Sequence, residues 1–201
     1  MAKRLFDAIG SALALLLLTP LLLVVAAVVK LDSPGPVLYR QVRIGRHGAP
    51  FRIHKFRTMT AGAPGLPLTV GDDPRITRAG HLLRRTRLDE LPQLLDVLRG
   101  AMSLVGPRPE VPRYVAHWPP ALRERALSVR PGLTDPSSLL FIDEAALLAR
   151  AADPEREYID VILPAKLQRA ADYAERATLA SDIGVLWRTL RVLVAGAAKS
   201  P

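Results

Sequence analysis

The chain of 201 residues contains no cysteine, and this absence excludes several classes of protein at once. Without thiols there is no disulfide scaffold, no cysteine-ligated zinc or iron–sulfur cluster, and no cysteine nucleophile. Histidine is scarce as well. The four histidines are His47, His54, His81 and His117, and no HExxH or similar ligand spacing occurs among them. A catalytic transition-metal site is therefore not expected.

Aromatic residues and the common nucleotide-binding motifs are also in short supply. Phe, Trp and Tyr make up 5% of the chain and form no cluster of the kind that stacks on RNA bases, so no nucleic-acid partner is expected. The sequence has no P-loop of the form GxxxxGK[ST], no GxGxxG that opens a helix, no evident Ser/His/Asp arrangement and no repeat of fixed period.

What the chain does contain is apolar material and an uneven positive charge. Hydrophobic residues make up 49% and charged residues 23%, which excludes a disordered chain, and the length suffices for a buried core in one or two domains. The formal net charge is +9. Residues 30–130 carry 18 Lys and Arg against 8 Asp and Glu, whereas residues 131–201 carry 8 against 10. The basic middle segment indicates a polyanion or an anionic membrane surface as its partner.

Residues 8–29 form an uncharged run of 22 positions, long enough for a transmembrane helix. Thr19-Pro20 interrupts it, and the proline removes one amide donor, which the Thr19 hydroxyl is well placed to replace. Basic residues flank the run on both sides: Lys3 and Arg4 before it, and Lys30, Arg40, Arg43 and Arg46 after it. Since positive flanks favour the cytoplasm, both ends are expected on one side, in a re-entrant helix–break–helix. A kinked single-pass anchor and a cleaved signal peptide are the alternatives.

Residues 37–44 and 51–59 have the composition of two strands joined by a turn at 45–48, which predicts a hairpin. Alternation along the second strand would place Lys55 and Arg57 on one face, either as a solvated basic surface or as a phosphate clamp. Residues 60–80 are rich in Gly, Pro, Thr and Asp and predict a loop.

Two adjacent carboxylates follow a group of arginines in the next segment. Leucines at helical spacing predict helix from residue 81 to 98, with Pro92 in the first turn of a second helix and Asp89 and Glu90 at its N-terminal edge. Arg84 could hold phosphate, and the two carboxylates could bind a hard cation or attack phosphorus. The alternative is that they only complement the helix dipole and form intrahelical ion pairs.

Two arginines lie in proline-containing turns. Arg108 stands between Pro107 and Pro109 after the apolar run 102–105, and Arg130 precedes Pro131. Proline restricts the backbone at both places, so these guanidinium groups are expected on rigid turns suited to anion binding.

The last third of the chain predicts helices at 141–152, 155–177 and 179–195. In the last of these, apolar residues that include Ile183, Trp187 and Leu190 fall at helical spacing. This stripe could pack on the domain core or lie at a membrane interface.

Four motifs in this order resemble one family. They are KFRTM (55–59), LRRTRLDELPQL (83–94), MSLVGPRPE (102–110) and RPGLT (130–134). After an N-terminal apolar segment with a central proline, they are similar to the bacterial sugar transferases, also called monotopic phosphoglycosyl transferases, over residues 1–135. Thr-Pro in place of Ser-Pro, and the unusual continuation DPSSLLFIDEAALL (135–148), are the departures from the family pattern.

The resemblance implies a helix-rich α/β fold at the cytoplasmic face of the bacterial inner membrane. Residues 1–32 would form the re-entrant membrane helix hairpin, broken at Thr19 and Pro20. Residues 33–201 would form the cytoplasmic catalytic domain, with a core at 33–135, a divergent helical part at 136–201, a short antiparallel sheet and interfacial helices. Contacts with inner-membrane lipids follow, and a homodimer is left open.

The resemblance also implies a reaction, in which a sugar-1-phosphate passes from a nucleotide diphosphate sugar, usually a UDP-sugar, to polyprenyl phosphate with release of UMP. Asp89 would be the nucleophile and Glu90 would help to hold Mg²⁺. The expected phosphate-binding residues are Lys55, Arg57, Arg84 and Arg108, to which the rigid-turn argument adds Arg130. The identity of the sugar stays open, and so do two rival functions: a membrane-tethered basic binding protein, and a conventional glycosyltransferase that releases UDP.

Overall fold

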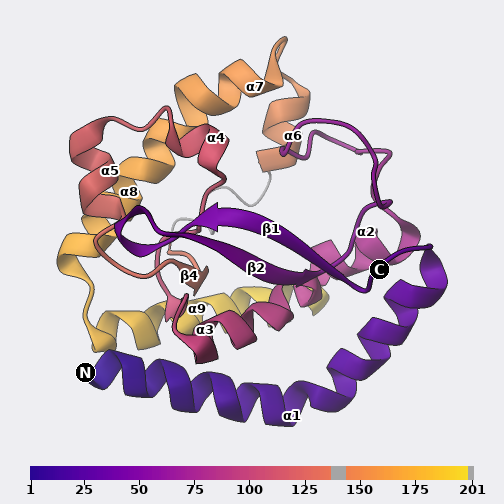
Figure 1. The fold of residues 1–201 in the computed structure, drawn as a ribbon, viewed down its shortest axis with the longest axis horizontal. Helices are drawn as coiled ribbons and strands as arrows, with labels where there is room; N and C mark the ends of the chain where they lie inside the picture. The colour runs from indigo at the N-terminus through magenta and orange to yellow at the C-terminus, as the bar shows by residue number, and fades with distance from the viewer. Residues whose placement is uncertain (137–143, 199–201) are drawn as a thin grey trace.

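The computed structural model describes residues 1–136 and 144–198. It is a helix-rich α/β structure in which one long apolar helix, α1 (Ala2–Asp32), lies along one side of a body built from shorter helices and strands (Figure 1). A short antiparallel sheet is present, as the sequence predicts. Residues 141–143 of the helix expected at 141–152 lie outside the described residues.

Helix α1 is continuous and bent, rather than two helices separated by a break (Figure 1). Pro20 lies inside it, and its missing N–H interrupts the ladder at one position only. The Thr19 hydroxyl donates a hydrogen bond of 2.7 Å to the carbonyl of Leu15, and not to the carbonyl of Leu16 that lacks the proline's N–H. A local bend therefore suffices to accommodate the proline.

The middle of α1 is apolar and exposed, whereas its two ends are packed against the body. Leu16 and Leu17 are 72% and 77% exposed, and Val25 and Val29 near the C-terminal end are buried. By length and composition the helix could cross a membrane. A continuous exposed apolar surface along a helix is characteristic of a site that contacts a membrane or a partner.

The N-terminal end of α1 is held by polar contacts. Lys3 forms an ion pair with Asp182 on α9 (Leu179–Ala198), and the Arg4 guanidinium donates two bonds of 2.6 Å to carbonyls in α3 (Leu94–Arg99). The buried carboxylate of Asp7 accepts the N–H of Leu104 at 3.0 Å.

The C-terminal end of α1 is held by one arginine and a small apolar cluster. The Arg57 guanidinium donates to the carbonyls of Val29 (3.3 Å), Ser33 (2.8 Å) and Pro36 (2.7 Å). Val29 also packs with Phe56 and Leu83. Because both ends of α1 contact the same body, the helix is bound to it at two separated points.

The predicted hairpin is confirmed. Strand β1 (Leu38–Ile44) pairs antiparallel with β2 (Pro50–Phe56) across a turn that includes the 3₁₀ segment Arg46–Gly48, and Tyr39 lies opposite Lys55. The second strand ends at Phe56 rather than at Met59, and Met59 forms an isolated bridge to Ile76 instead.

A second two-stranded sheet was not predicted. Strand β3 (Ser103–Val105) pairs in parallel with β4 (Gly132–Thr134). The turns that follow β3 and precede β4 are pressed together, since a Cβ added to Gly132 would lie 2.0 Å from the backbone nitrogen of Gly106. Glycine is required for this close approach. The two proline-containing arginine turns are therefore neighbours, although 22 residues separate Arg108 from Arg130 in the chain.

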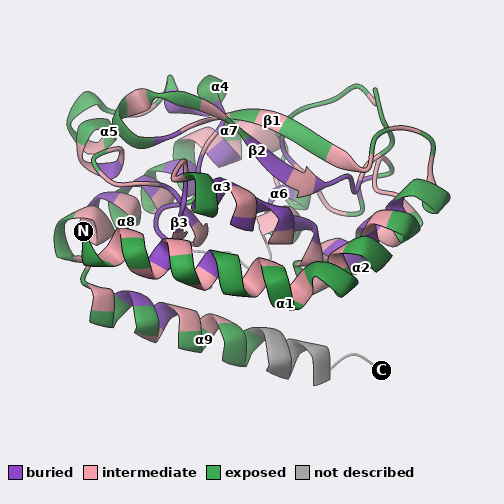
Figure 2. Cartoon of the chain, turned by 60° about the horizontal axis from the view of Figure 1, so that its bottom comes forward, coloured by how far each residue is buried: buried purple, intermediate pink, exposed green. Residues whose placement is uncertain are grey.

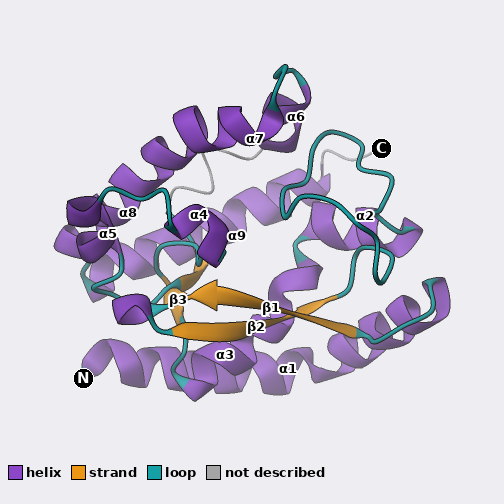
Figure 3. Cartoon of the chain, turned by 45° about the horizontal axis from the view of Figure 1, so that its top comes forward, coloured by secondary structure: helices purple, strands orange, loops and turns teal. Residues whose placement is uncertain are grey.

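The remaining elements are short helices around this centre (Figure 3). They are α2 (Arg78–Thr86), the 3₁₀ segment Leu88–Gln93, α4 (Pro112–Val115), α5 (Pro120–Ala126), α6 (Glu144–Ala149), α7 (Pro154–Glu157), the π-helical turn Tyr158–Ile162 and α8 (Leu163–Arg176). The largest buried cluster lies under α8 and includes Leu68, Leu148 and Tyr158.

Helix α9 confirms the prediction for 179–195, and its apolar stripe is on the surface. Ile183, Trp187 and Leu190 are all more than half exposed. Helices α1 and α9 run along the same side of the molecule (Figure 2). The exposed apolar residues of the two helices thus belong to one side of the fold.

Candidate active site

Asp89 and Glu90 lie in a 3₁₀ turn between two helices, and both are buried. Helix α2 ends at Thr86, and Arg87 then adopts a left-handed conformation with φ = 59°. This conformation is uncommon for a residue other than glycine, and such residues cluster at functional sites. The predicted helix start at Pro92 is replaced by this tighter turn, which directs the two carboxylates inward.

The Asp89 carboxyl is buried, and its surroundings raise its pKa. Its Oδ1 atom is buried without a hydrogen-bond partner among the described residues. Burial and the neighbouring charge of Glu90 raise its pKa to about 6, against the opposing effect of Lys55, Arg84 and Arg108. At neutral pH it is therefore largely ionised but poorly solvated, a state that favours nucleophilic attack.

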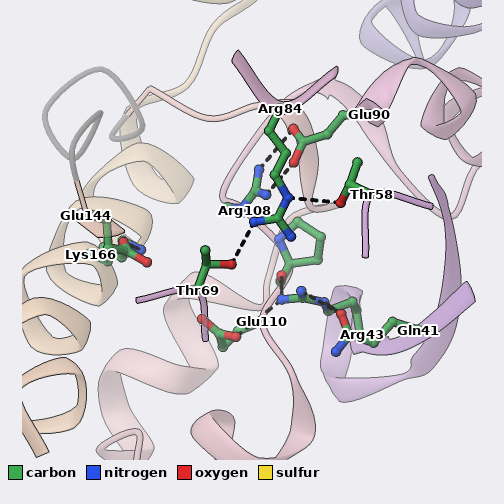
Figure 4. Close-up of polar contacts among 11 residues, drawn as sticks. Gln41, Arg43, Thr58, Thr69, Arg84, Glu90, Arg108, Glu110, Glu144 and Lys166 are labelled. Carbon is green, nitrogen blue, oxygen red and sulfur yellow. Dashed lines mark hydrogen bonds and ion pairs between the residues drawn. The ribbon is translucent and has the colours of Figure 1, made fainter. Parts of the chain in front are cut away.

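Glu90 has the opposite environment. The Arg108 guanidinium binds both of its carboxylate oxygens, at 2.5 and 3.2 Å (Figure 4). Burial works against ionisation, but the charge and hydrogen bonds of Arg108 outweigh it and hold the pKa of Glu90 at about 2. Two adjacent carboxyls with pKa values pushed apart are the pattern expected of a catalytic pair.

Lys55 contributes a second cation. It stands on β2, and its ammonium nitrogen lies 5.8 Å from the centre of the Tyr39 ring. Burial lowers its pKa to about 8, while Asp89 and Glu90 act in the opposite direction. The ammonium group is thus charged at neutral pH and close to losing its proton above it.

Arg84 contributes a third cation from the last turn of α2. Its Nε donates to the Thr58 hydroxyl at 2.9 Å, and its Nη1 donates to the Thr69 hydroxyl at 2.8 Å (Figure 4). Burial lowers the pKa of this guanidinium, and the charge of Asp89 opposes the shift. Sequence analysis missed both threonines. Thr58 belongs to the KFRTM motif, but Thr69 lies in a loop with no motif to mark it.

Two of the predicted phosphate-binding arginines have other contacts. The Arg57 guanidinium is buried at the end of α1, because β2 ends before residue 57 and the alternation with Lys55 does not continue. Arg130 donates its Nε to the carbonyl of Gly100 at 2.8 Å. The structure therefore brings together Lys55, Arg84 and Arg108, whereas Arg57 and Arg130 donate to backbone carbonyls.

Glu110 is a further, partly buried carboxylate that the sequence analysis did not single out. It pairs with Arg43 on β1 at 3.3 Å and accepts the hydroxyl of Tyr158. It thus ties the turn that carries Arg108 to the hairpin through Arg43 (Figure 4). Through Tyr158 it ties the same turn to the C-terminal helices.

The carboxylate pair fits a magnesium ion that is completed by substrate. Among the described residues no group of three or more His, Cys, Asp or Glu side chains could hold a metal alone. Mg²⁺, however, commonly uses one or two carboxylates together with substrate phosphates and water. Within the pair, the lone pairs that Arg108 leaves free on the Glu90 oxygens are suitable ligands for such an ion, and the unpartnered Oδ1 of Asp89 stays available for another role.

The chain is similar to several characterised proteins. It is 48% identical to the UDP-glucose:undecaprenyl-phosphate glucose-1-phosphate transferase of Caulobacter vibrioides. The 136 matched residues cover 66% of this chain and 51% of the relative. The chain is 34% identical to a UDP-N-acetylgalactosamine-undecaprenyl-phosphate N-acetylgalactosaminephosphotransferase of Aeromonas hydrophila. The 199 matched residues cover 96% of this chain and 44% of the relative. The exopolysaccharide production protein PSS of Rhizobium leguminosarum is 55% identical over 109 residues, 53% of this chain and 54% of the relative.

The chain thus spans about half the length of these curated relatives. A family model described as bacterial sugar transferase matches residues 1–196, which include the hairpin, the carboxylate pair, the Arg108 turn and most of the C-terminal helices. The chain therefore belongs to the bacterial sugar transferase family.

Proposed function

We propose that the protein transfers a sugar-1-phosphate from a UDP-sugar to polyprenyl phosphate and releases UMP. The observation that carries this proposal is the buried, unpartnered oxygen of Asp89 among the cations Lys55, Arg84 and Arg108. The Caulobacter and Aeromonas relatives, whose names describe transfer from UDP-sugars to undecaprenyl phosphate, support it.

The reaction proceeds in two displacements at one phosphorus. A carboxylate oxygen of Asp89 forms a bond to the phosphorus that carries the sugar, and the bond from this phosphorus to the bridging oxygen breaks, so UMP leaves with the electron pair. An oxygen of the lipid phosphate then attacks the same phosphorus and displaces Asp89. The negative charge that develops in both steps faces Lys55, Arg84 and Arg108, and such fixed cations supply much of the acceleration of phosphoryl transfer.

Glu90 has a separate role in this scheme. Its bidentate contact with Arg108 orients both groups, and the lone pairs left on its oxygens would hold Mg²⁺. When bound, the ion neutralises charge on the donor's phosphates.

The contacts of α1 support a monotopic, re-entrant arrangement at the cytoplasmic face of the inner membrane. Lys3 and Arg4 at one end and Val29 at the other all bind the body that carries the active site. A spanning helix would place one of these ends across the membrane from the body. The exposed leucines in the middle of α1 would then enter one leaflet, and α9, with Trp187 and Leu190, would lie at the interface.

The position of the carboxylate pair relative to α1 suits a lipid acceptor. Leu88, which directly precedes Asp89, packs against the cluster formed by Val25, Val29, Phe56 and Leu83 at the C-terminal half of α1. The nucleophile thus lies close to the helix proposed to be embedded, where the phosphate group of a polyprenyl lipid would be at the membrane surface.

Product analysis tests the proposal. The protein in nanodiscs, supplied with a UDP-sugar, polyprenyl phosphate and Mg²⁺, is expected to release UMP. Release of UDP instead would indicate a conventional glycosyltransferase. If neither nucleotide appeared with any of a panel of UDP-sugars, a basic, membrane-bound protein without catalysis would be the better description.

A further inference from the structure

Arg84 differs from Arg108 in how its guanidinium is held. Arg108 is bound by the carboxylate of Glu90, whereas Arg84, among the residues that the structure describes, donates hydrogen bonds to the neutral hydroxyls of Thr58 and Thr69. Resting on the function proposed above, we propose that Thr58 and Thr69 are positioning residues that orient Arg84 for the donor's phosphates, and that Thr69 couples this orientation to the C-terminal helices.

Neutral acceptors suit this task for an electrostatic reason. A carboxylate partner cancels most of the charge of a guanidinium, so less remains for a ligand. A hydroxyl oxygen accepts a hydrogen bond without adding a negative charge. The two threonines occupy Nε and Nη1 of Arg84 without adding a negative charge, which leaves its remaining N–H groups for phosphate oxygens.

Thr58 is fixed rigidly against α2. It is 2% exposed, and its carbonyl accepts the N–H of Thr77, the residue that caps α2, at 3.0 Å. Gly80 lies directly against this carbonyl, since a Cβ added there would come within 2.1 Å of it. Gly80 and Arg84 are four residues apart and so lie on one face of α2. The contact at Gly80 therefore sets the position of Arg84 relative to the Thr58 hydroxyl.

Thr69 is fixed from the opposite direction. Its neighbour Leu68 is buried in the cluster under α8, where it packs with Leu148 of α6. Two residues further along, the N–H of Gly71 donates to the carbonyl of Ala145 at 2.9 Å. The loop that carries Thr69 is thus attached on both sides of this residue to the part of the chain that diverges most from the family pattern.

Single substitutions separate the hydroxyl from the packing. Thr69→Val keeps the shape but removes the acceptor, and it is expected to lower kcat/KM for UMP release about ten- to hundred-fold, the effect of one lost hydrogen bond to a charged group. Thr69→Ser keeps the acceptor and is expected to stay within about threefold of the wild type. Thr58→Val should behave like Thr69→Val. Melting temperatures of all variants are recorded in parallel.

A double-mutant cycle decides whether the threonine acts through Arg84. In an Arg84→Lys background, which keeps the charge but lacks Nε and the forked guanidinium, Thr69→Val should have little further effect on kcat/KM. For variants with little turnover, the dissociation constant of the UDP-sugar is compared instead of kcat/KM. Equal losses in both backgrounds, or a Thr69→Ser variant as impaired as Thr69→Val, would overturn the positioning role. Failure of the proposed function would look different, because the wild type itself would then release no UMP.

Discussion

At the scale of single residues, the proposed reaction depends on two groups that titrate on either side of neutrality. Burial, and to a smaller extent the charge of Glu90, raises the pKa of Asp89 to about 6. Burial lowers the pKa of Lys55 to about 8. Asp89 must be ionised to attack, and Lys55 must be protonated to neutralise phosphate charge.

The pH profile of kcat/KM is therefore expected to be bell-shaped. It should rise as pH increases through about 6 and fall as pH increases through about 8. Lys55→Arg supplies a cation that does not titrate in this range, so the alkaline limb should disappear while the acid limb remains. An alkaline limb that persists unchanged in Lys55→Arg would assign that limb to another group.

The raised pKa of Asp89 also predicts an effect on stability. A folded-state pKa above the ordinary value of 3.8 means that folding disfavours the charged form, so this residue's contribution to stability is lost as pH rises from about 4 to about 6. Without ligands at pH 7.5, Asp89→Asn should increase the free energy of unfolding by about 1–3 kcal/mol. Each kcal/mol should raise Tm by roughly 2–4 °C. At pH 4 the difference should vanish. Asp72→Asn, at an exposed position, is the matched control, and an equal rise in that variant would refute the explanation.

At the scale of elements, α1 decides how the protein meets the membrane. Its N-terminal end is bound through Arg4 and its C-terminal end through Arg57, both to the same body. Single cysteines at Ala2 and Asp32 are possible in a chain that has no cysteine of its own. Both are expected to resist a membrane-impermeant thiol reagent in intact cells and to react after permeabilisation. Labelling of Ala2→Cys in intact cells would mean that the helix spans the membrane.

Element prediction from sequence succeeded where local patterns decide the structure. The hairpin followed from alternation and a glycine-flanked turn, and α9 followed from helical spacing. The bend in α1 was expected at Pro20, but not the continuity of the helix, because the contacts that hold both of its ends come from residues such as Lys3 and Arg57 bonding across the fold. The pairing of β3 with β4 was also missed, since two three-residue strands carry almost no periodic signal.

At the scale of the whole molecule, the candidate site was predictable only in part. The Asp89-Glu90 pair, Lys55, Arg84 and Arg108 were identified from motifs, and the structure brings them together. Arg57 and Arg130 carry the same charge and stand in similar motifs, yet tertiary contacts direct them to backbone carbonyls. Thr69 was missed for the converse reason. Its position is set by core packing between segments far apart in the chain, which a motif does not record.

The whole arrangement serves one chemical claim, that Asp89 becomes covalently attached to the phosphosugar. The most direct measurement incubates the protein with labelled UDP-sugar and Mg²⁺ but without lipid acceptor, and tests for a protein-bound label that hydroxylamine removes. The wild type is expected to become labelled and Asp89→Asn is not. Glu90→Gln should label more slowly and require more Mg²⁺, because an amide is a poorer ligand for a hard cation. A labelled Asp89→Asn protein, or one that retains substantial turnover, would contradict the account.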